Sequence, residues 1–183
     1  MVNDVLDDLK NEMVKALESL QKELSRMRTG RANLAILDGV RVDYYGSATP
    51  LNQVASLHTP EPRLIMIKPW EKSMVPVIEK AILAADLGFN PSNDGEVVRI
   101  PIPPLTEQRR QELVKMAKKT GEEFKIQVRR IRRDANDMLK EFEKAKDISE
   151  DDMHRAMEEV QKHTDDYSQK VDEQIAAKEK EIL

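Results

Sequence analysis

Residues 106–146 constrain the fold of this chain most, because they predict one helix too long for a small compact domain. Three prolines precede the segment, and Thr106 is placed to cap its first turn. About 41 residues at roughly 1.5 Å each would extend about 60 Å. Apolar or small residues recur in alternating steps of three and four, which is typical of a helix-bundle seam. This row consists of Val114, Ala117, Gly121, Phe124, Val128, Ile131, Ala135, Met138, Phe142 and Ala145.

Four arginines occupy five consecutive positions of the same segment, namely Arg129, Arg130, Arg132 and Arg133. At about 100° per residue, three of them point away from the apolar row and Arg132 lies on its flank. Guanidinium groups stay charged at cellular pH and form paired hydrogen bonds with phosphate oxygens. The cluster therefore favours binding to the backbone of structured RNA, but a solvated, salt-bridged helix face would have the same composition.

The charge is distributed unevenly along the chain, whose formal net charge is −4. Residues 106–146 carry 13 basic and 8 acidic side chains, a net charge of +5. Residues 147–183 carry 5 basic and 12 acidic side chains, a net charge of −7. Because the field near a surface follows the nearby charges, the basic helix can bind a polyanion although the whole chain is acidic.

Two further helices flank the long one in the sequence. Residues 2–27 contain neither Gly nor Pro and repeat large apolar residues at helical spacing. At 148–153, Ser149 can cap a helix start, and Ile148 with Met153 can form a hydrophobic staple. We therefore predict a three-helix bundle in which the second and third helices are antiparallel through a short turn.

Between the first and second helices the composition changes. All nine prolines lie between Pro50 and Pro104. Short β-branched or aromatic runs at 40–45, 54–58, 64–67 and 96–102 predict strands, and residues 72–86 have helical spacing. The predicted fold class is α+β, with a small β/α/β domain at 31–105 inserted into a discontinuous bundle formed by 1–30 and 106–183.

Two chain segments would join the bundle to the insert, and such a two-strand connection can act as a hinge. Gly30 permits a sharp change of chain direction on the outward segment, and prolines stiffen the return. The predicted hinge residues are Thr29, Gly30, Arg31, Pro103, Pro104, Leu105 and Thr106.

Catalytic and metal-binding patterns are poorly represented. The chain has no cysteine, its three histidines are scattered, and no glycine-rich phosphate loop occurs. We expect no catalytic site, no metal and no cofactor. Neither a membrane-spanning apolar run nor a signal-peptide pattern is present, so we expect a soluble, cytoplasmic, monomeric protein.

Several collinear motifs carry a family resemblance. They are RTGRA at 28–32, DYYG at 43–46, TPL at 49–51, DLGFNP at 86–91, RIPIPPLTEQRR at 99–110 and RRDAN at 132–136. With these motifs at matching spacing, the chain closely resembles the bacterial ribosome recycling factor family over essentially its whole length.

The resemblance implies an L-shaped fold similar in outline to a transfer RNA. It implies binding to ribosomal RNA of the large subunit after termination, and splitting of the ribosome into subunits, with release of the messenger RNA, together with the GTPase elongation factor G. In the family, the arginine that matches Arg132 is central to ribosome binding. The predicted RNA-binding residues are Arg132, Arg129, Arg133, Arg130, Arg110 and Arg28.

A second hypothesis belongs to a different functional class. The long apolar row could pair with a partner helix, which would make the protein a helical interaction module that binds proteins and no RNA. Co-sedimentation with ribosomes stripped of soluble factors would distinguish the two hypotheses.

Overall fold

The computed structural model describes residues 1–183, which divide into two compact units. Unit 1 comprises Met1–Met27 and Gln108–Leu183, and unit 2 comprises Arg28–Glu107. Unit 1 is helical, whereas unit 2 combines strands with short helices. The predicted fold class, a helix bundle with a small α+β insertion, is confirmed.

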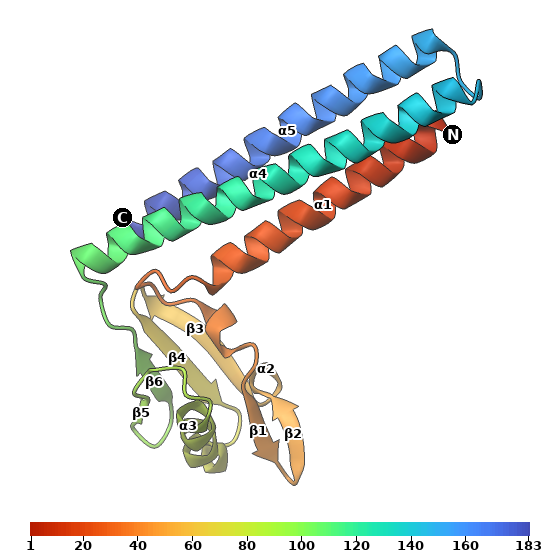
Figure 1. Ribbon diagram of the computed structural model, residues 1–183. Coiled ribbons are helices and arrows are strands. Elements are labelled where there is room, and N and C mark those ends of the chain that lie inside the picture. Colours follow the sequence, from red (N-terminus) through yellow and green to blue (C-terminus); the bar gives the residue numbers. More distant parts are fainter. The chain divides into compact units, whose positions relative to one another are not determined.

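Three helices lie side by side in unit 1, namely α1 (Val2–Arg26), α4 (Glu107–Lys144) and α5 (Glu150–Ile182) (Figure 1). The apolar face of α1 is fully buried at Leu9, Met13 and Leu20, as its helical spacing predicts. The predicted start of α5 is also confirmed, since Ser149 accepts a hydrogen bond from the Asp152 amide at 3.1 Å. At the turn before it, Lys146 has a positive φ of 62°.

The buried row of α4 differs from the predicted seam at both ends. Leu113 is buried where Val114 was predicted, and Leu139 is buried where Met138, now 43% exposed, was predicted. At each end the row advances by four residues instead of three, because a straight helix has 3.6 residues per turn and drifts from a strict 3.5-residue repeat. The middle of the row agrees with the prediction, at Ala117, Gly121, Phe124, Val128, Ile131 and Ala135.

Gly121 of α4 packs directly against Ile175 of α5. A Cβ atom added to Gly121 would lie 2.7 Å from Cγ1 and 3.0 Å from Cδ1 of Ile175. Such a separation is shorter than packed carbon atoms tolerate. The absence of a side chain at this position therefore lets the two helices approach closely.

Unit 2 contains a four-stranded antiparallel sheet in the order β3-β4-β6-β5 and a hairpin formed by β1 and β2. The strands are β1 (Arg41–Tyr44), β2 (Ser47–Pro50), β3 (Ala55–Glu61), β4 (Leu64–Pro69), β5 (Ser92–Asn93) and β6 (Val98–Pro101). The helices are α2 (Leu51–Val54) and α3 (Val75–Ala84), with 3₁₀ turns at Leu34–Leu37 and Lys72–Met74. Ile65, Ile67, Ile78 and Ile100 are fully buried between α3 and the sheet.

The sequence missed part of unit 2. Strands β2 and β5 were not predicted, since both are short, polar and exposed or only partly buried. The helix predicted at 72–86 begins with a 3₁₀ turn and becomes α-helical at Val75, with Pro76 in its first turn. Pro76 is tolerated there because the first amides of a helix have no partner within it.

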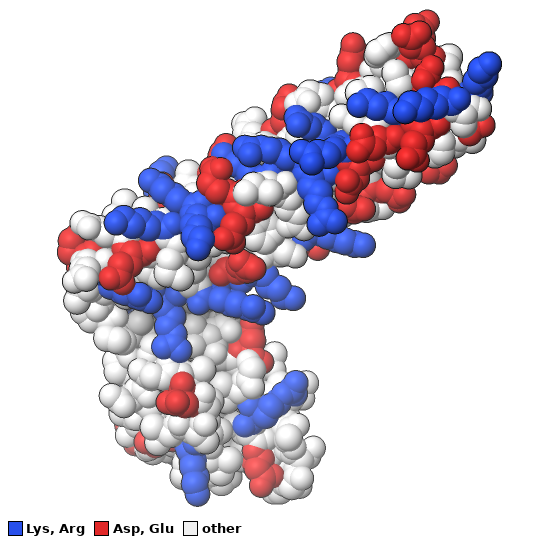
Figure 2. All heavy atoms as spheres, in the orientation of Figure 1, with Lys and Arg blue, Asp and Glu red and all other residues white.

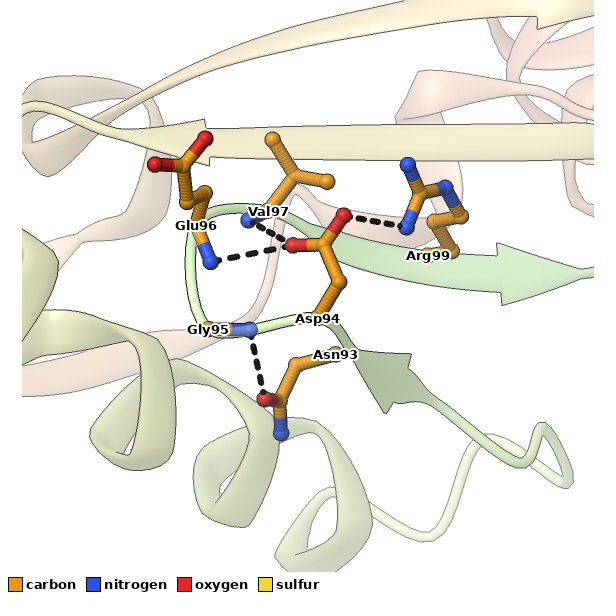
Figure 3. A network of polar contacts seen from close by, with 6 residues as sticks. All are labelled: Asn93, Asp94, Gly95, Glu96, Val97 and Arg99. Atoms are coloured by element: carbon orange, nitrogen blue, oxygen red, sulfur yellow. Dashed lines mark hydrogen bonds and ion pairs between the residues drawn. The ribbon is translucent and has the colours of Figure 1, made fainter.

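A turn built on Asp94 joins β5 to β6 (Figure 3). One oxygen of the Asp94 carboxylate accepts the amides of Glu96 and Val97 at 3.0 Å each, and the other accepts Arg99 Nη1 at 2.8 Å. The two backbone amides, with the Arg99 guanidinium, hold the pKa of this carboxyl well below its ordinary value. The turn therefore fixes the start of β6.

None of the helices combines the length and the apolar character that crossing a lipid bilayer would require.

Because Gly121 packs against Ile175, we expect the substitution of Gly121 by alanine to change stability in an unusual direction. Replacing a mid-helix glycine with alanine usually raises the free energy of unfolding by about 1 kcal/mol. Overpacking a buried contact lowers it by about 1–3 kcal/mol. We expect Gly121→Ala to lower the free energy of unfolding by about 1 kcal/mol, as the balance of these effects.

Chemical denaturation measures this change. In an Ile175→Ala background the clash is absent, so Gly121→Ala should become neutral or stabilising. Gly39→Ala is the control, since a Cβ there would meet nothing within 4 Å. Stabilisation by Gly121→Ala in the otherwise unchanged chain would show that the helices are not in tight contact.

Candidate nucleic-acid interface

The side of α4 opposite its buried row carries three of the predicted arginines. Arg129, Arg130 and Arg133 are exposed, whereas the adjacent Val128 and Ile131 are buried. Helical geometry brings positions 126, 129, 130 and 133 onto one side, because residues three, four and seven apart are neighbours on a helix. We call Ile126, Arg129, Arg130 and Arg133 the outer α4 face.

The arginines of the outer α4 face are little engaged within the protein. The sole ion pair is between Arg130 Nε and Asp134 Oδ2 at 3.9 Å, and both side chains are more than half exposed. A long, exposed pair of this kind contributes little to stability. Arg129 and Arg133 form no ion pair or side-chain hydrogen bond. Their guanidinium groups are therefore available to an external ligand.

Lysines of α4 that lie toward α5 behave differently. Lys125 Nζ lies 2.5 Å from Asp172 Oδ1 and 3.6 Å from Glu122 Oε1. The hydrogen bond with Asp172 raises the pKa of Lys125. Lys118 Nζ lies 3.1 Å from Glu179 Oε1. The acidic α5 thus pairs with these lysines and forms no ion pair with the outer arginines.

Arg132 occupies the flank between the buried row and the outer α4 face, as predicted. It is half-buried, and its Nη1 donates to Oε1 of Gln161 on α5 at 3.3 Å. Nε2 of Gln161 in turn donates to Oδ1 of Asp165 at 2.8 Å. Because Asp165 accepts from the amide nitrogen, it orients the amide oxygen of Gln161 toward Arg132. This chain of two hydrogen bonds restricts the Arg132 rotamer.

The structure does not bring Arg110 and Arg28 onto the outer α4 face. Arg110 is half-buried and lies three residues before the buried Leu113, on the packed side of α4. Arg28 belongs to unit 2, where its guanidinium carbon lies 5.1 Å from the centroid of the Phe89 ring. A Cβ added to Gly88 would lie 3.2 Å from Nη1 of Arg28, so this loop accommodates the arginine closely.

Lys and Arg side chains gather on one stretch of unit 1. Figure 2 shows a dense group of them along the middle of the helices, with Asp and Glu beside it and charges of both signs at the end where α4 turns into α5. A local concentration of cations of this kind attracts a polyanion whatever the net charge of the chain.

The predicted hinge residues lie close together inside unit 2. Thr29 is buried, Gly30 has a φ of +74°, and a Cβ added to Gly30 would lie 2.9 Å from Cγ of Leu105. The amide of Ala32 donates to the Pro62 carbonyl at 2.7 Å, and that of Ile102 donates to the Arg63 carbonyl at 2.8 Å. The two segments therefore pack on one another and on the β3–β4 turn.

Comparison with known proteins decides the family. The family model described as "Ribosome recycling factor" matches residues 20–183. The chain belongs to the ribosome recycling factor family. It is 56% identical over 183 residues to the ribosome-recycling factors of Anaeromyxobacter dehalogenans and Myxococcus xanthus, covering 100% of this chain and 97% and 99% of theirs. The predicted family resemblance is thereby confirmed.

Solved structures agree with this family assignment. A solution structure of a ribosome recycling factor superposes with a TM-score of 0.79 at 41% identity, covering 99% of this chain and 96% of that one. A second similar chain comes from models of the T. thermophilus ribosome recycling factor and E. coli elongation factor G on the E. coli post-termination complex. It has a TM-score of 0.67 and 43% identity, covering 100% of this chain and 99% of that one. The family consists of translation factors rather than enzymes, in agreement with the predicted lack of catalysis.

Two residues of the site were missed from the sequence. Gln161 contacts Arg132 only because of the register between α4 and α5, and no sequence pattern specifies that register. Ile126 left a weak signal, since it is a large apolar residue that falls outside the predicted apolar row.

Proposed function

We propose that this protein recycles ribosomes. It binds the post-termination ribosome in the cytoplasm and, with elongation factor G and GTP, splits it into subunits and releases the messenger RNA. The observation that carries this proposal is the full-length similarity to ribosome recycling factors. The similar T. thermophilus factor, which is described together with elongation factor G on a post-termination complex, supports the choice of partners.

Contact with the ribosome is proposed to be made to large-subunit RNA through Arg129, Arg130 and Arg133. Their exposure, and the absence of strong internal ion pairs, support this assignment. Arginine suits the role because its planar group presents several N–H donors to phosphate oxygens. Arg132 would contact the same RNA from the flank of α4, with its side chain already oriented by Gln161.

Arg110 and Arg28 are proposed as additional RNA contacts that also pack within the protein. Arg28 stacks over Phe89 yet remains exposed, so guanidinium N–H groups not used in packing can reach a phosphate. Arg110 retains partial exposure on the packed side of α4. We expect substitutions of these two arginines to affect both packing and binding.

The two units are proposed to change their relative orientation during splitting. The segments around Gly30 and Leu105 pack within unit 2, so bending would occur where they join α1 and α4. Extended backbone follows α1 directly, since Met27 has φ −71° and ψ 121°. Relative motion of two units joined in this way is the default expectation unless a large apolar interface prevents it.

Distance measurements between spin labels test this hinge, and the absence of native cysteine permits single-site labelling. A pair at the exposed Glu159 and Ser73, one in each unit, should give a broad distribution or several populations. A pair at Glu159 and Glu12, both in unit 1, should give one narrow distribution. Equally narrow distributions for both pairs would exclude the hinge.

The proposed activity is tested by light scattering on post-termination ribosomes. We expect subunits to separate only when this protein, elongation factor G and GTP are all present. Sedimentation of the protein with factor-stripped ribosomes should accompany splitting. A protein that neither sediments with ribosomes nor splits them would instead fit the helical interaction module.

Arg132 and Gln161 are expected to act as one unit in ribosome binding. Arg132→Ala should weaken binding by about tenfold or more, equivalent to roughly 1.4 kcal/mol. Gln161→Leu keeps the side-chain size but removes the acceptor, and should weaken binding by about threefold, or roughly 0.7 kcal/mol. In the Arg132→Ala background, Gln161→Leu should cause no further loss.

Gln169→Leu is the matched control, because Gln169 donates to Glu173 on the same helix without contacting an arginine. Gln161→Glu removes the N–H donated to Asp165 and places a negative charge beside Arg132, so it should also weaken binding. Additive losses from Arg132→Ala and Gln161→Leu would show that Gln161 does not act through Arg132.

A further inference from the structure

Ile126 is an exposed apolar side chain at one end of the basic surface formed by Arg129, Arg130 and Arg133. Its side chain is 60% exposed, more than any other large hydrophobic residue of the helices apart from the terminal Leu183. Phe124 and Val128, its neighbours two positions away, are both buried in the seam. Ile126 therefore has no part in holding the bundle together.

Three arginines follow Ile126 on the outer α4 face. At about 100° per residue, Arg133 lies roughly 20° to one side of Ile126, Arg130 about 40° to the other and Arg129 about 60° away. From residue 126 to residue 133 the helix rises about 10 Å. Glu122 and Glu123 lie before this stretch and Asp134 and Asp137 after it, so the basic surface is short.

Local stability gives no reason for isoleucine at this position. Single exposed apolar residues are common on protein surfaces. However, β-branched side chains lose rotamer freedom in a helix, and Lys, Glu or Ala would favour the helix more. An apolar side chain beside exposed arginines combines the two kinds of contact that an interface uses, namely desolvated apolar area and directed polar bonds.

The charges of this surface select the class of ligand. A ligand that matches it must present negative groups beside an apolar patch, over about 10 Å. RNA fits this requirement, since its phosphates flank ribose and base surfaces that are accessible in the shallow minor groove and at unstacked nucleotides.

We propose that Ile126 is an RNA-contacting residue of the ribosome-binding surface. It packs against the ribose and base surface of a ribosomal RNA nucleotide, while Arg129, Arg130 and Arg133 bind the phosphates around that nucleotide. This inference rests on the proposed function and adds an apolar contact to the predicted electrostatic one.

The salt dependence of binding to isolated large subunits distinguishes an apolar contact from a phosphate contact. Ile126→Ala should weaken binding about fivefold at every salt concentration, because burial of apolar area does not release counterions. Arg129→Ala should also lower the slope of log affinity against log salt, by about 0.7–0.9 for one lost phosphate contact. Ile126→Leu should bind like the unchanged protein.

Met138→Ala is the matched control, since Met138 is 43% exposed on the same helix and lies about 120° around it from Ile126. Circular dichroism would verify that each variant remains folded. If Ile126→Ala binds like the unchanged protein while Arg129→Ala binds more weakly, the apolar contact is refuted and the proposed function stands. If the unchanged protein fails to bind large subunits, the proposed function itself is refuted.

A photo-reactive benzoylphenylalanine at position 126 identifies what this residue contacts. Irradiation of the complex with large subunits should attach the protein to ribosomal RNA. Attachment only to ribosomal proteins would overturn the assignment of RNA as the ligand of Ile126. The same group at position 138 should give little attachment to RNA.

Discussion

The close packing of α4 against its neighbouring helices determines which of its side chains can meet a partner. Gly121 allows Ile175 of α5 to approach α4 closely, and the buried row on either side of it fixes the rotation of α4 about its axis. Because a helix is stiff, fixing one side also fixes the other. The outer arginines are therefore presented by a rigid surface and lose little conformational freedom of the backbone when they bind.

Electrostatics within unit 1 reinforces this division. Acidic side chains of α5 pair with Lys118 and Lys125 of α4, whereas Arg129 and Arg133 have no such partners. The strong negative charge of residues 147–183 thus offsets the lysines beside α5 without offsetting the outer arginines. Gln161 makes a neutral contact with Arg132, which orients the guanidinium while leaving its positive charge available.

Much of this arrangement follows from short-range sequence patterns. The helical periodicity predicted three long helices, and Ser149 was correctly predicted to cap the third. What the sequence could not provide depends on contacts between distant segments. The register of α4 on α5 decides that Leu113 and Leu139 are buried and that Gln161 contacts Arg132. Similarly, β2 and β5 form because they pair with β1 and β6, whereas their own residues give no strand pattern.

Directed hydroxyl-radical cleavage of ribosomal RNA tests most directly whether the outer side of α4 faces the ribosome. A single cysteine at the exposed Gln127, carrying a tethered iron chelate, would place the radical source beside the outer α4 face. A second cysteine variant at the exposed Asp166 would place the source on α5. We predict strong, localised cleavage of large-subunit RNA from position 127 and much weaker cleavage from position 166. Stronger cleavage from position 166, or none from position 127 in a protein that still binds, would contradict this account.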